Sequence, residues 1–164
     1  MDGMLGRLYP SEVCSAARAL EIVGERWSLL IVRNAMFAGT TRFTDFQRGL
    51  GIAPNILTKR LTEFVEAGIF EARQNDGGKH AEYVLTRKGR DLQPVILALT
   101  EWGDRWVAPG TRPITYVHDG CGGRVTLRTE CTRCGDSPPS EGVKARVARW
   151  PRAAKDALTS RDTA

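Results

Sequence analysis

The sequence predicts a mainly α-helical protein with a small β-hairpin, an α+β fold. Apolar residues recur at helical spacing in residues 43–50, 54–65 and 92–106, whereas residues 69–86 form two strand-like runs around an Asn-Asp-Gly-Gly turn. A length of 164 residues and a hydrophobic content of 41% support one compact domain with a modest appendage. The chain is therefore not expected to be intrinsically disordered.

The first of these helices is predicted over residues 43–50. Phe43, Phe46 and Leu50 are spaced so that they share one buried face. Gly49 and Gly51 then interrupt the helical pattern, because glycine favours turns over helix interiors. A tight turn is expected to follow.

A second helix is predicted directly after this turn, with Pro54 in its first turn, where the missing N–H of proline costs nothing. Leu57, Leu61 and Phe64 form its buried ridge. The opposite face therefore carries small polar and cationic side chains near the helix N-terminus, which are the groups that base edges and phosphates require. These residues are Asn55, Thr58, Lys59 and Thr62, with Pro54 at the entrance and Arg60 near the edge.

A β-hairpin is predicted over residues 69–86, with strands 69–74 and 79–86 around the turn. Three basic side chains, Arg73, Lys79 and His80, then lie near its tip. Two helices followed by a basic hairpin are typical of a winged helix-turn-helix, in which the second helix enters a major groove and the hairpin grips the flanking phosphates. The alternative is an ordinary amphipathic helix pair with a solvated hairpin tip.

Four motifs stand in order along the chain. They are CSAARALEIVGERWSLLIVR at residues 14–33, RFTDF at 42–46, LTKRL at 57–61 and YVLTRKG at 83–89. Together they resemble the HxlR-type winged-helix transcriptional regulators, relatives of the MarR group, over residues 13–107. The resemblance implies a homodimer in which the first and last helices of each subunit pack together and the two recognition helices enter successive major grooves.

One residue departs from the family pattern. The family commonly has Ser where this chain has Ala53, so the second helix is expected to lack its usual side-chain N-cap, a loss of about 1 kcal/mol. Contact with DNA is an alternative way of completing that helix end.

The last predicted helix supports a dimer. Its apolar stripe is too wide for a helix lying alone on a small domain, so part of it is expected to form core and the excess a subunit interface. The half-sites of a bound operator should then lie about one helical turn, roughly 10 to 10.5 base pairs, apart or a multiple of that. The stripe consists of Leu92, Val95, Ile96, Leu99, Trp102 and Trp106.

The predicted function is sequence-specific binding of double-stranded DNA by a homodimeric transcriptional regulator. We predict a repressor rather than an activator, because a dimer seated over a promoter blocks polymerase without further contacts. Asn55, Thr58 and Lys59 are predicted to approach base edges. The residues predicted to hold the DNA backbone are Thr44, Arg60, Arg73, Lys79 and His80, and Pro54 lies at the same helix end.

Composition agrees with this function. A formal net charge of +5 suits a polyanionic partner, although basic surfaces are common enough that charge alone is weak support. The chain start has no apolar signal core and no stretch approaches bilayer-spanning length, so we expect a cytoplasmic protein without a membrane partner. An enzyme is not expected, because there are only two histidines and no glycine-rich phosphate loop follows a strand.

Residues 114–136 carry two pairs of potential metal ligands. His118 and Cys121 form an H-x2-C pair, Cys131 and Cys134 form a C-x2-C pair, and a glycine follows each pair. Three thiolates and one imidazole make a closed tetrahedral Zn2+ set, so a structural, zinc-ribbon-like hairpin is predicted. The alternatives are reversible disulfide formation and metal-free surface cysteines. A rival function follows, a zinc-ribbon interaction module whose helical part binds protein partners.

Cys14 stands apart from these pairs, near the start of the first helix. The helix dipole and Arg18, one turn on, would favour its thiolate, and the resemblance implies an oxidant or electrophile sensor at this position in some members. The alternative is an apolar filler in the dimer seam. A small apolar effector bound between the dimer helices is a further expectation, although no residue identifies it.

The predicted domain boundaries follow from these features. An N-terminal arm covers residues 1–12, the winged-helix and dimerisation domain residues 13–108, and the Cys/His appendage residues 114–136. Residues 137–164 begin with Ser-Pro-Pro-Ser and continue with a run rich in arginine and lysine, and they are interpreted as a basic linker and tail.

Overall fold

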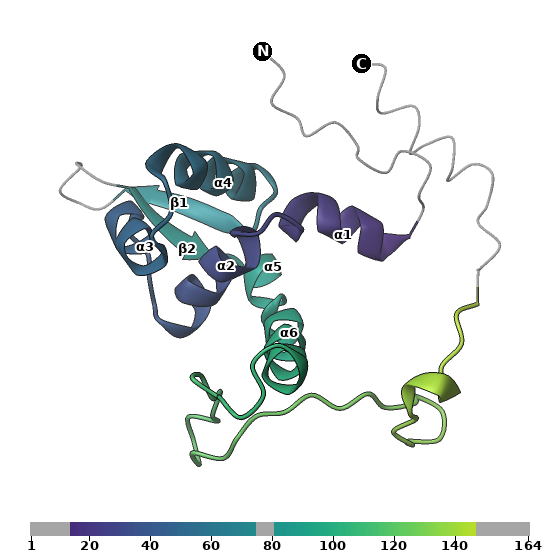
Figure 1. The fold of residues 1–164 in the computed structure, drawn as a ribbon. Coiled ribbons are helices and arrows are strands. Elements are labelled where there is room, and N and C mark those ends of the chain that lie inside the picture. Colours follow the sequence, from purple (N-terminus) through teal and green to yellow (C-terminus); the bar gives the residue numbers. More distant parts are fainter. Residues whose placement is uncertain (1–13, 75–80, 147–164) are drawn as a thin grey trace, which may run out of the picture. The chain divides into compact units, whose positions relative to one another are not determined.

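The computed structural model describes residues 14–74 and 81–146 (Figure 1). The chain forms two compact units, Met1–Leu127 and Arg128–Ala164. The described part of the second unit contains one short 3-10 helix, η1, Ser140–Gly142. The elements of the first unit are α1 Ser15–Val23, α2 Ser28–Phe37, α3 Phe43–Leu50, α4 Pro54–Glu66, β1 Phe70–Gln74, β2 Ala81–Leu85, α5 Arg87–Arg90 and α6 Gln93–Trp106.

The first unit packs around α2, which contacts α1, α3, α6 and β2. Ile31 and Val32 of α2 are completely buried, as are Leu57 and Leu61 of α4. The predicted helices over residues 43–50 and after Pro54 are confirmed, and Gly51 ends α3 in the left-handed conformation, with φ of 62°. No helix within the described residues is long and apolar enough to cross a membrane.

Three phenylalanines join the helix pair to the hairpin. The ring of Phe46 in α3 lies edge-on to Phe70 in β1, with centroids 6.2 Å apart. Phe64 in α4 lies 5.7 Å from the same ring. Because all three side chains are buried, α3 and α4 are held against the first strand of the hairpin.

The hairpin is a two-stranded antiparallel sheet in which Phe70 pairs with Leu85 and Gln74 with Ala81. Its base is fixed by the TRKG motif: Thr86 caps α5 by accepting a hydrogen bond from the Gly89 N–H and donates one to the Gly68 carbonyl oxygen at 2.6 Å. A Cβ atom at Gly89 would collide with the carbonyl oxygen of Ile69, so this close approach requires glycine.

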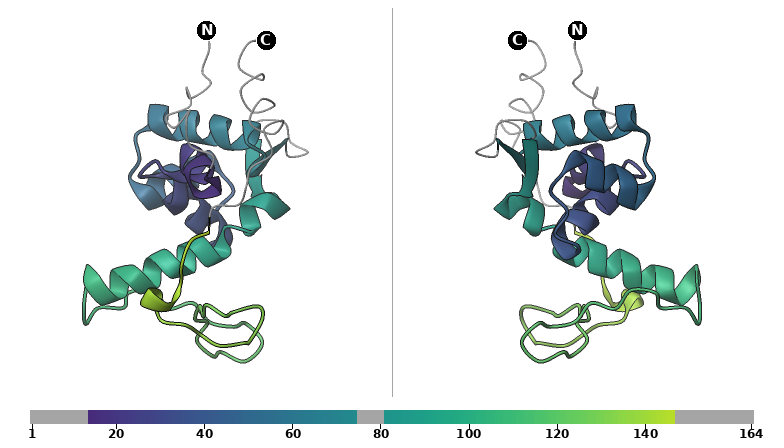
Figure 2. Two further views of the ribbon diagram at one scale, coloured as in Figure 1. Left: turned by 90° about the vertical axis from the view of Figure 1, so that its right-hand side faces the viewer. Right: turned by 90° about the vertical axis from the view of Figure 1, so that its left-hand side faces the viewer.

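The apolar stripe of α6 divides between two environments. Ile96 is buried in the core, together with Leu97, which sequence reasoning did not include. Leu99 and Trp102 lie outward and are more than half exposed. Figure 2 shows the second half of α6 extending away from the other helices and the hairpin, and the outward side of this half, with Leu99 and Trp102, is left uncovered.

The segment between the two Cys/His pairs, predicted as a zinc-ribbon-like hairpin, contains no strand. Within residues 108–146, all of which the structure describes, the only β-pairing is an isolated antiparallel bridge between Val117 and Arg124. The bridge is extended by one hydrogen bond, from the Val125 N–H to the Tyr116 carbonyl oxygen. Strand-like pairing in this segment is thus limited to the residues that flank the turn at residues 118–123.

Candidate nucleic-acid interface

The exposed face of α4 carries the polar residues that the helical spacing placed there. Asn55, Thr58 and Lys59 are exposed, while Leu57 and Leu61 are buried on the opposite side. A three-residue turn connects α3 to α4, so this face follows directly from the way the helix pair packs against β1. Pro54 and Thr62 are also exposed.

These side chains differ in the groups that they leave free. Thr58 donates its hydroxyl hydrogen to the Pro54 carbonyl oxygen, 2.9 Å away, so it presents a methyl group and an acceptor oxygen. Lys59 Nζ lies 3.9 Å from a Glu63 carboxylate oxygen, a separation that leaves the ammonium group largely solvated. The Asn55 amide makes no hydrogen bond with a described residue, and amides of this kind contact the edge of adenine in a bidentate manner.

Arg60 does not belong to this surface, and its prediction as a DNA contact was wrong. Its side chain is only 6% exposed and lies against Glu63, with Nη1 2.9 Å from a carboxylate oxygen. A second carboxylate, that of Glu25, lies 3.8 Å away. The contact with Glu63 is an ion pair without hydrogen-bond geometry, because neither Glu63 oxygen has a hydrogen-bond partner within the described chain. Arg60 therefore balances the negative charge of the largely buried Glu63 carboxylate.

Ile56 is a surface residue that the predicted polar face of this helix did not include. It is 38% exposed and follows Asn55 in the first turn of α4. An exposed isoleucine beside polar residues suits the methyl group of thymine, which base-reading helices contact through apolar side chains. The sequence held one sign of this exposure: Ile56 lies beside the helical repeat formed by Leu57 and Leu61 and is not part of it.

The first turns of α3 and α4 both lack a side-chain cap. Ala53 caps α4 without a side-chain hydrogen bond, as the departure from the family pattern predicts. Arg42 stands at the same position of α3, and Thr44 in the first turn of α3 is exposed. The N–H groups at these helix ends need partners from solvent or from a ligand.

Arg42 and β2 connect α3 to the hairpin. Arg42 Nε lies 3.5 Å from a carboxylate oxygen of Glu82, and the Tyr83 N–H donates to the Thr41 carbonyl oxygen at 2.8 Å. An ion pair and a backbone hydrogen bond therefore link the start of α3 to the second strand. Thr44 lies two residues beyond Arg42, beside this connection.

The basic tip of the hairpin is described only in part. Lys79 and His80 lie outside the described residues, whereas Arg73 is exposed on β1. Arg73 donates a hydrogen bond to Glu71 at 3.0 Å. This hydrogen bond and the accompanying charge attraction lower the pKa of Glu71 and raise the pKa of Arg73. Both side chains are more than half exposed, so the pair costs little to open when a phosphate approaches.

The two Cys/His pairs lie in different units, with His118 and Cys121 in the first and Cys131 and Cys134 in the second. In the first pair, His118 Nδ1 lies 3.2 Å from Cys121 Sγ. In the second, hydrogen bonds from the backbone N–H of Cys134 and then of Arg133, followed by the Cys134 thiol, lower the pKa of Cys131. Among the described residues, no three His, Cys, Asp or Glu side chains are grouped to hold a metal ion.

Cys14 is exposed at the N-cap position of α1, as its place in the sequence suggests. Arg18 does not serve it as a cationic neighbour, however. The Arg18 guanidinium is bound by Glu21, with an N–O distance of 3.0 Å. The cation expected beside Cys14 is therefore paired with a carboxylate of the same helix.

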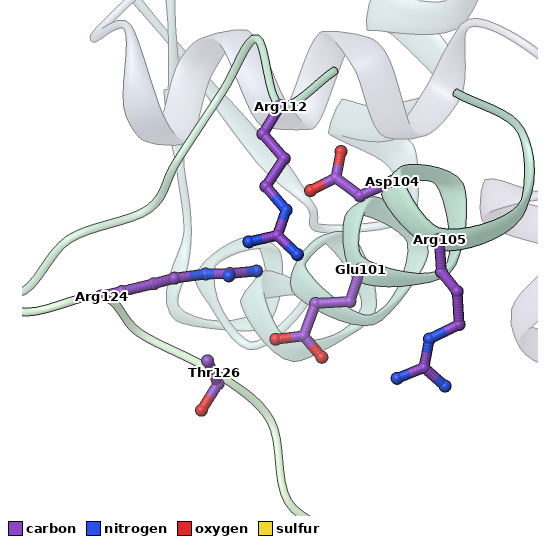
Figure 3. A pocket seen from close by; sticks show the side chains of 6 residues that line it. All are labelled: Glu101, Asp104, Arg105, Arg112, Arg124 and Thr126. Carbon is purple, nitrogen blue, oxygen red and sulfur yellow. The ribbon is translucent and has the colours of Figure 1, made fainter. Parts of the chain in front are cut away.

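A pocket of about 320 Å³ lies between α6 and the segment that follows it (Figure 3). Arg112 and Arg124 extend toward each other across it, and the carboxylates of Glu101 and Asp104 lie on the α6 side. Glu101 also accepts a hydrogen bond from the Leu127 N–H at 3.3 Å. A lining of this kind suits a polar or charged ligand.

The chain is similar to several regulators of transcription. The model of the HxlR-like helix-turn-helix family matches residues 22–111. The uncharacterized HTH-type transcriptional regulator Rv3095 of Mycobacterium tuberculosis is 42% identical over 145 residues, which cover 82% of this chain and 90% of Rv3095.

Solved structures give the same result. PA1607, a candidate transcription factor, is 39% identical with a TM-score of 0.76, over 86% of this chain and 98% of PA1607. The redox regulator HypR in its reduced form is 31% identical with a TM-score of 0.52, over 57% of this chain and 96% of HypR.

Proposed function

Since this chain belongs to the HxlR-like helix-turn-helix family of transcriptional regulators, we propose that it binds specific sequences of double-stranded DNA as a homodimer and represses transcription. The chain is a regulator with a helix-turn-helix fold and not an enzyme. Repression is the simpler mode of action, because a dimer that covers a promoter excludes polymerase without touching it.

The observation that carries this proposal is the exposed face of α4. Asn55, Ile56 and Lys59 offer an amide, an apolar side chain and an ammonium group within the first two turns of a helix that ends a helix-turn-helix. Such a helix enters the major groove with its N-terminal residues against base edges. The uncapped N–H groups after Ala53 would then lie near a phosphate.

Exposed apolar side chains on α1 and α6 support the dimer. Leu20 of α1 is 54% exposed, and Leu99 and Trp102 of α6 are 53% and 58% exposed. Large side chains of this type are costly to leave in water and favour association. These are the two helices that pack between subunits according to the family resemblance.

Replacing Asn55 with alanine tests the base contact. We expect affinity for the preferred duplex to fall by about 1–3 kcal/mol, while affinity for random duplex changes little, because the amide reads base edges. Replacing Lys79 should instead weaken all duplexes alike, since a phosphate contact carries no sequence information. Fluorescence anisotropy with a duplex selected from a random pool, at several salt concentrations, measures both effects.

Glu66→Ala is the matched control for this experiment, because Glu66 is exposed at the other end of the same helix. It should leave the preference unchanged. Equal losses of Asn55→Ala on preferred and random duplexes would contradict base reading. If no duplex competes with excess random DNA at physiological salt, the rival function, a module that binds protein partners, replaces the one proposed here.

We propose that Cys14 makes the regulator responsive to oxidants. Its exposure at a helix N-terminus supports the proposal, and so does similarity to HypR, a redox regulator. Hypochlorite or a quinone should release DNA from the unmodified protein, and Cys14→Ser should abolish this release without changing affinity under reducing conditions. Oxidant sensitivity that survives in Cys14→Ser would assign the response to another group.

A further inference from the structure

The charged pocket beside α6 has the size and the lining of a site for a small molecule. Its volume of about 320 Å³ lies at the lower end of the range found for ligand sites, which suits a ligand of few non-hydrogen atoms. All of its lining residues belong to the first unit, and all but one of them carry a charge. They are Glu101, Asp104, Arg105, Arg112, Arg124 and Thr126.

The backbone sets the positions of the two arginines that follow α6. Gly110, with φ of 82°, and a hydrogen bond from the Thr111 N–H to the Ala108 carbonyl oxygen turn the chain directly before Arg112. Arg124 pairs with Val117 in the isolated antiparallel bridge. Both arginines are exposed, so a ligand in solution can reach them.

This bridge is attached to the helices at two points. The ring of Tyr116, the residue before the bridge, lies 4.2 Å from the ring of Phe37 in α2, measured between centroids. The Leu127 N–H donates to a Glu101 carboxylate oxygen in α6 at 3.3 Å. The wall that carries Arg124 is therefore held in place without a ligand, and a preformed site loses less conformational entropy on binding.

Arg112 and Arg124 point toward each other across the pocket without an anion between them (Figure 3). Neither guanidinium group forms an ion pair or a side-chain hydrogen bond within the part of the chain that the structure describes. Like charges that face each other repel, whereas an anionic group placed between them is attracted by both. Carboxylates and phosphates match the planar fork of a guanidinium group.

The α6 side of the pocket carries the opposite charge. The half-buried Asp104 carboxylate has no ion pair or side-chain hydrogen bond with a described residue, and Glu101 uses one oxygen for the Leu127 N–H. Arg105, the third cation, points away from Arg112 and Arg124 (Figure 3). Two carboxylates repel a ligand that is only anionic and attract an ammonium group. The lining therefore favours a ligand with both charges.

We propose that this pocket binds a small zwitterion, with its anionic group between Arg112 and Arg124 and its ammonium group toward Glu101 and Asp104. The anionic group is a carboxylate or a phosphate, because guanidinium groups bind both through paired hydrogen bonds. Binding is non-covalent and changes no bond of the ligand. The pocket lies outside the exposed face of α4, so this inference goes beyond DNA binding and does not depend on it.

Nuclear magnetic resonance titration of the full chain without DNA tests the proposal. The probes are glycine, β-alanine, γ-aminobutyrate and ε-aminocaproate, which separate the two charges by increasing lengths, and phosphoethanolamine, which replaces the carboxylate with a phosphate. At least one should cause saturable shifts of backbone resonances in residues 101–105, 112 and 124–126. Butyrate and butylamine, which each lack one charge, should bind at least about tenfold more weakly. Equal binding of butyrate, or no saturable shift with any zwitterion, overturns the proposal.

Charge-neutral variants separate the two ends of the site. Arg112→Gln and Arg124→Gln should each weaken binding of the best zwitterion by about 10- to 100-fold. Asp104→Asn should weaken the zwitterion but not butyrate, because it removes attraction for the ammonium group together with repulsion of the anion. A merely structural role of Asp104 would weaken both ligands alike and would contradict the assignment of the ammonium end.

Arg87→Gln is the matched control, because Arg87 is an exposed arginine of α5 outside the pocket lining. It makes the same change of charge and should keep the affinity of the unmodified protein. If affinity is also unchanged in Arg112→Gln and Arg124→Gln, the anionic group binds elsewhere and the proposal is wrong. A loss in Arg87→Gln as large as in those two variants would show a general effect of net charge, and it too would overturn the site.

Discussion

Replacing Arg60 with methionine is expected to destabilise the folded protein by about 3–5 kcal/mol, because the change leaves a buried carboxylate without its partner. The Glu63 side chain is only 15% exposed, and its nearest other cation, Lys59 Nζ, is 3.9 Å away. Chemical denaturation followed by far-UV circular dichroism measures the free energy of unfolding. The size of the effect reflects the cost of the unpaired charge rather than the strength of the pair.

A double variant separates these two quantities. Arg60→Met combined with Glu63→Met removes both charges and fills a similar volume, so most of the lost stability should return. If the double variant is as unstable as the single one, the ion pair is not what Arg60 contributes. The salt dependence of DNA binding by the folded double variant should match that of the unmodified protein, because Arg60 does not reach a phosphate.

Replacing Trp102 with arginine is expected to dissociate the proposed dimer and to lower affinity for a two-half-site operator by about 10²- to 10⁴-fold. The side chain is 58% exposed in the single chain, so a charge there should not disturb the fold of one subunit but would be buried at the interface. A monomer loses the gain in effective concentration that comes from linking two recognition helices. Analytical ultracentrifugation and anisotropy measure the two effects.

Ile114→Arg provides the matched control, because Ile114 is exposed to a similar degree but lies after α6. This variant carries the same added charge and should stay dimeric. Affinity for a single half-site should be nearly the same in the Trp102 variant and the unmodified protein. A Trp102→Arg protein that remains dimeric, or that keeps full affinity for the long operator, would place the subunit interface elsewhere.

Helical spacing alone predicted the helix-turn-helix well. The helix expected over residues 43–50 is α3, and the ridge of Leu57, Leu61 and Phe64 is fully buried in α4. Local signals sufficed here because a glycine turn, a proline at a helix start and a repeating apolar face act over a few residues. The hairpin strands were also placed within two residues of their ends, since an Asn-Asp-Gly-Gly turn fixes where the chain reverses.

Burial was harder to predict for residues at the border between the buried and exposed faces of a helix. Arg60 and Lys59 are neighbours with the same charge, yet one is buried and the other is exposed. Arg60 also lies 3.8 Å from Glu25, a residue far away in the sequence that no local pattern places beside α4. Leu97 is also buried, although it lies outside the predicted apolar stripe of α6.

The sequence by itself determined the order of elements, the exposed polar face of α4 and the spacing of the Cys/His pairs, because each depends on residues that are close together along the chain. Only the tertiary structure decided that Glu25 lies near the buried Arg60, that Phe46 packs edge-on against Phe70, and that the Tyr83 N–H donates to the Thr41 carbonyl oxygen. Those features arise from packing and backbone hydrogen bonds between residues whose proximity no local pattern records.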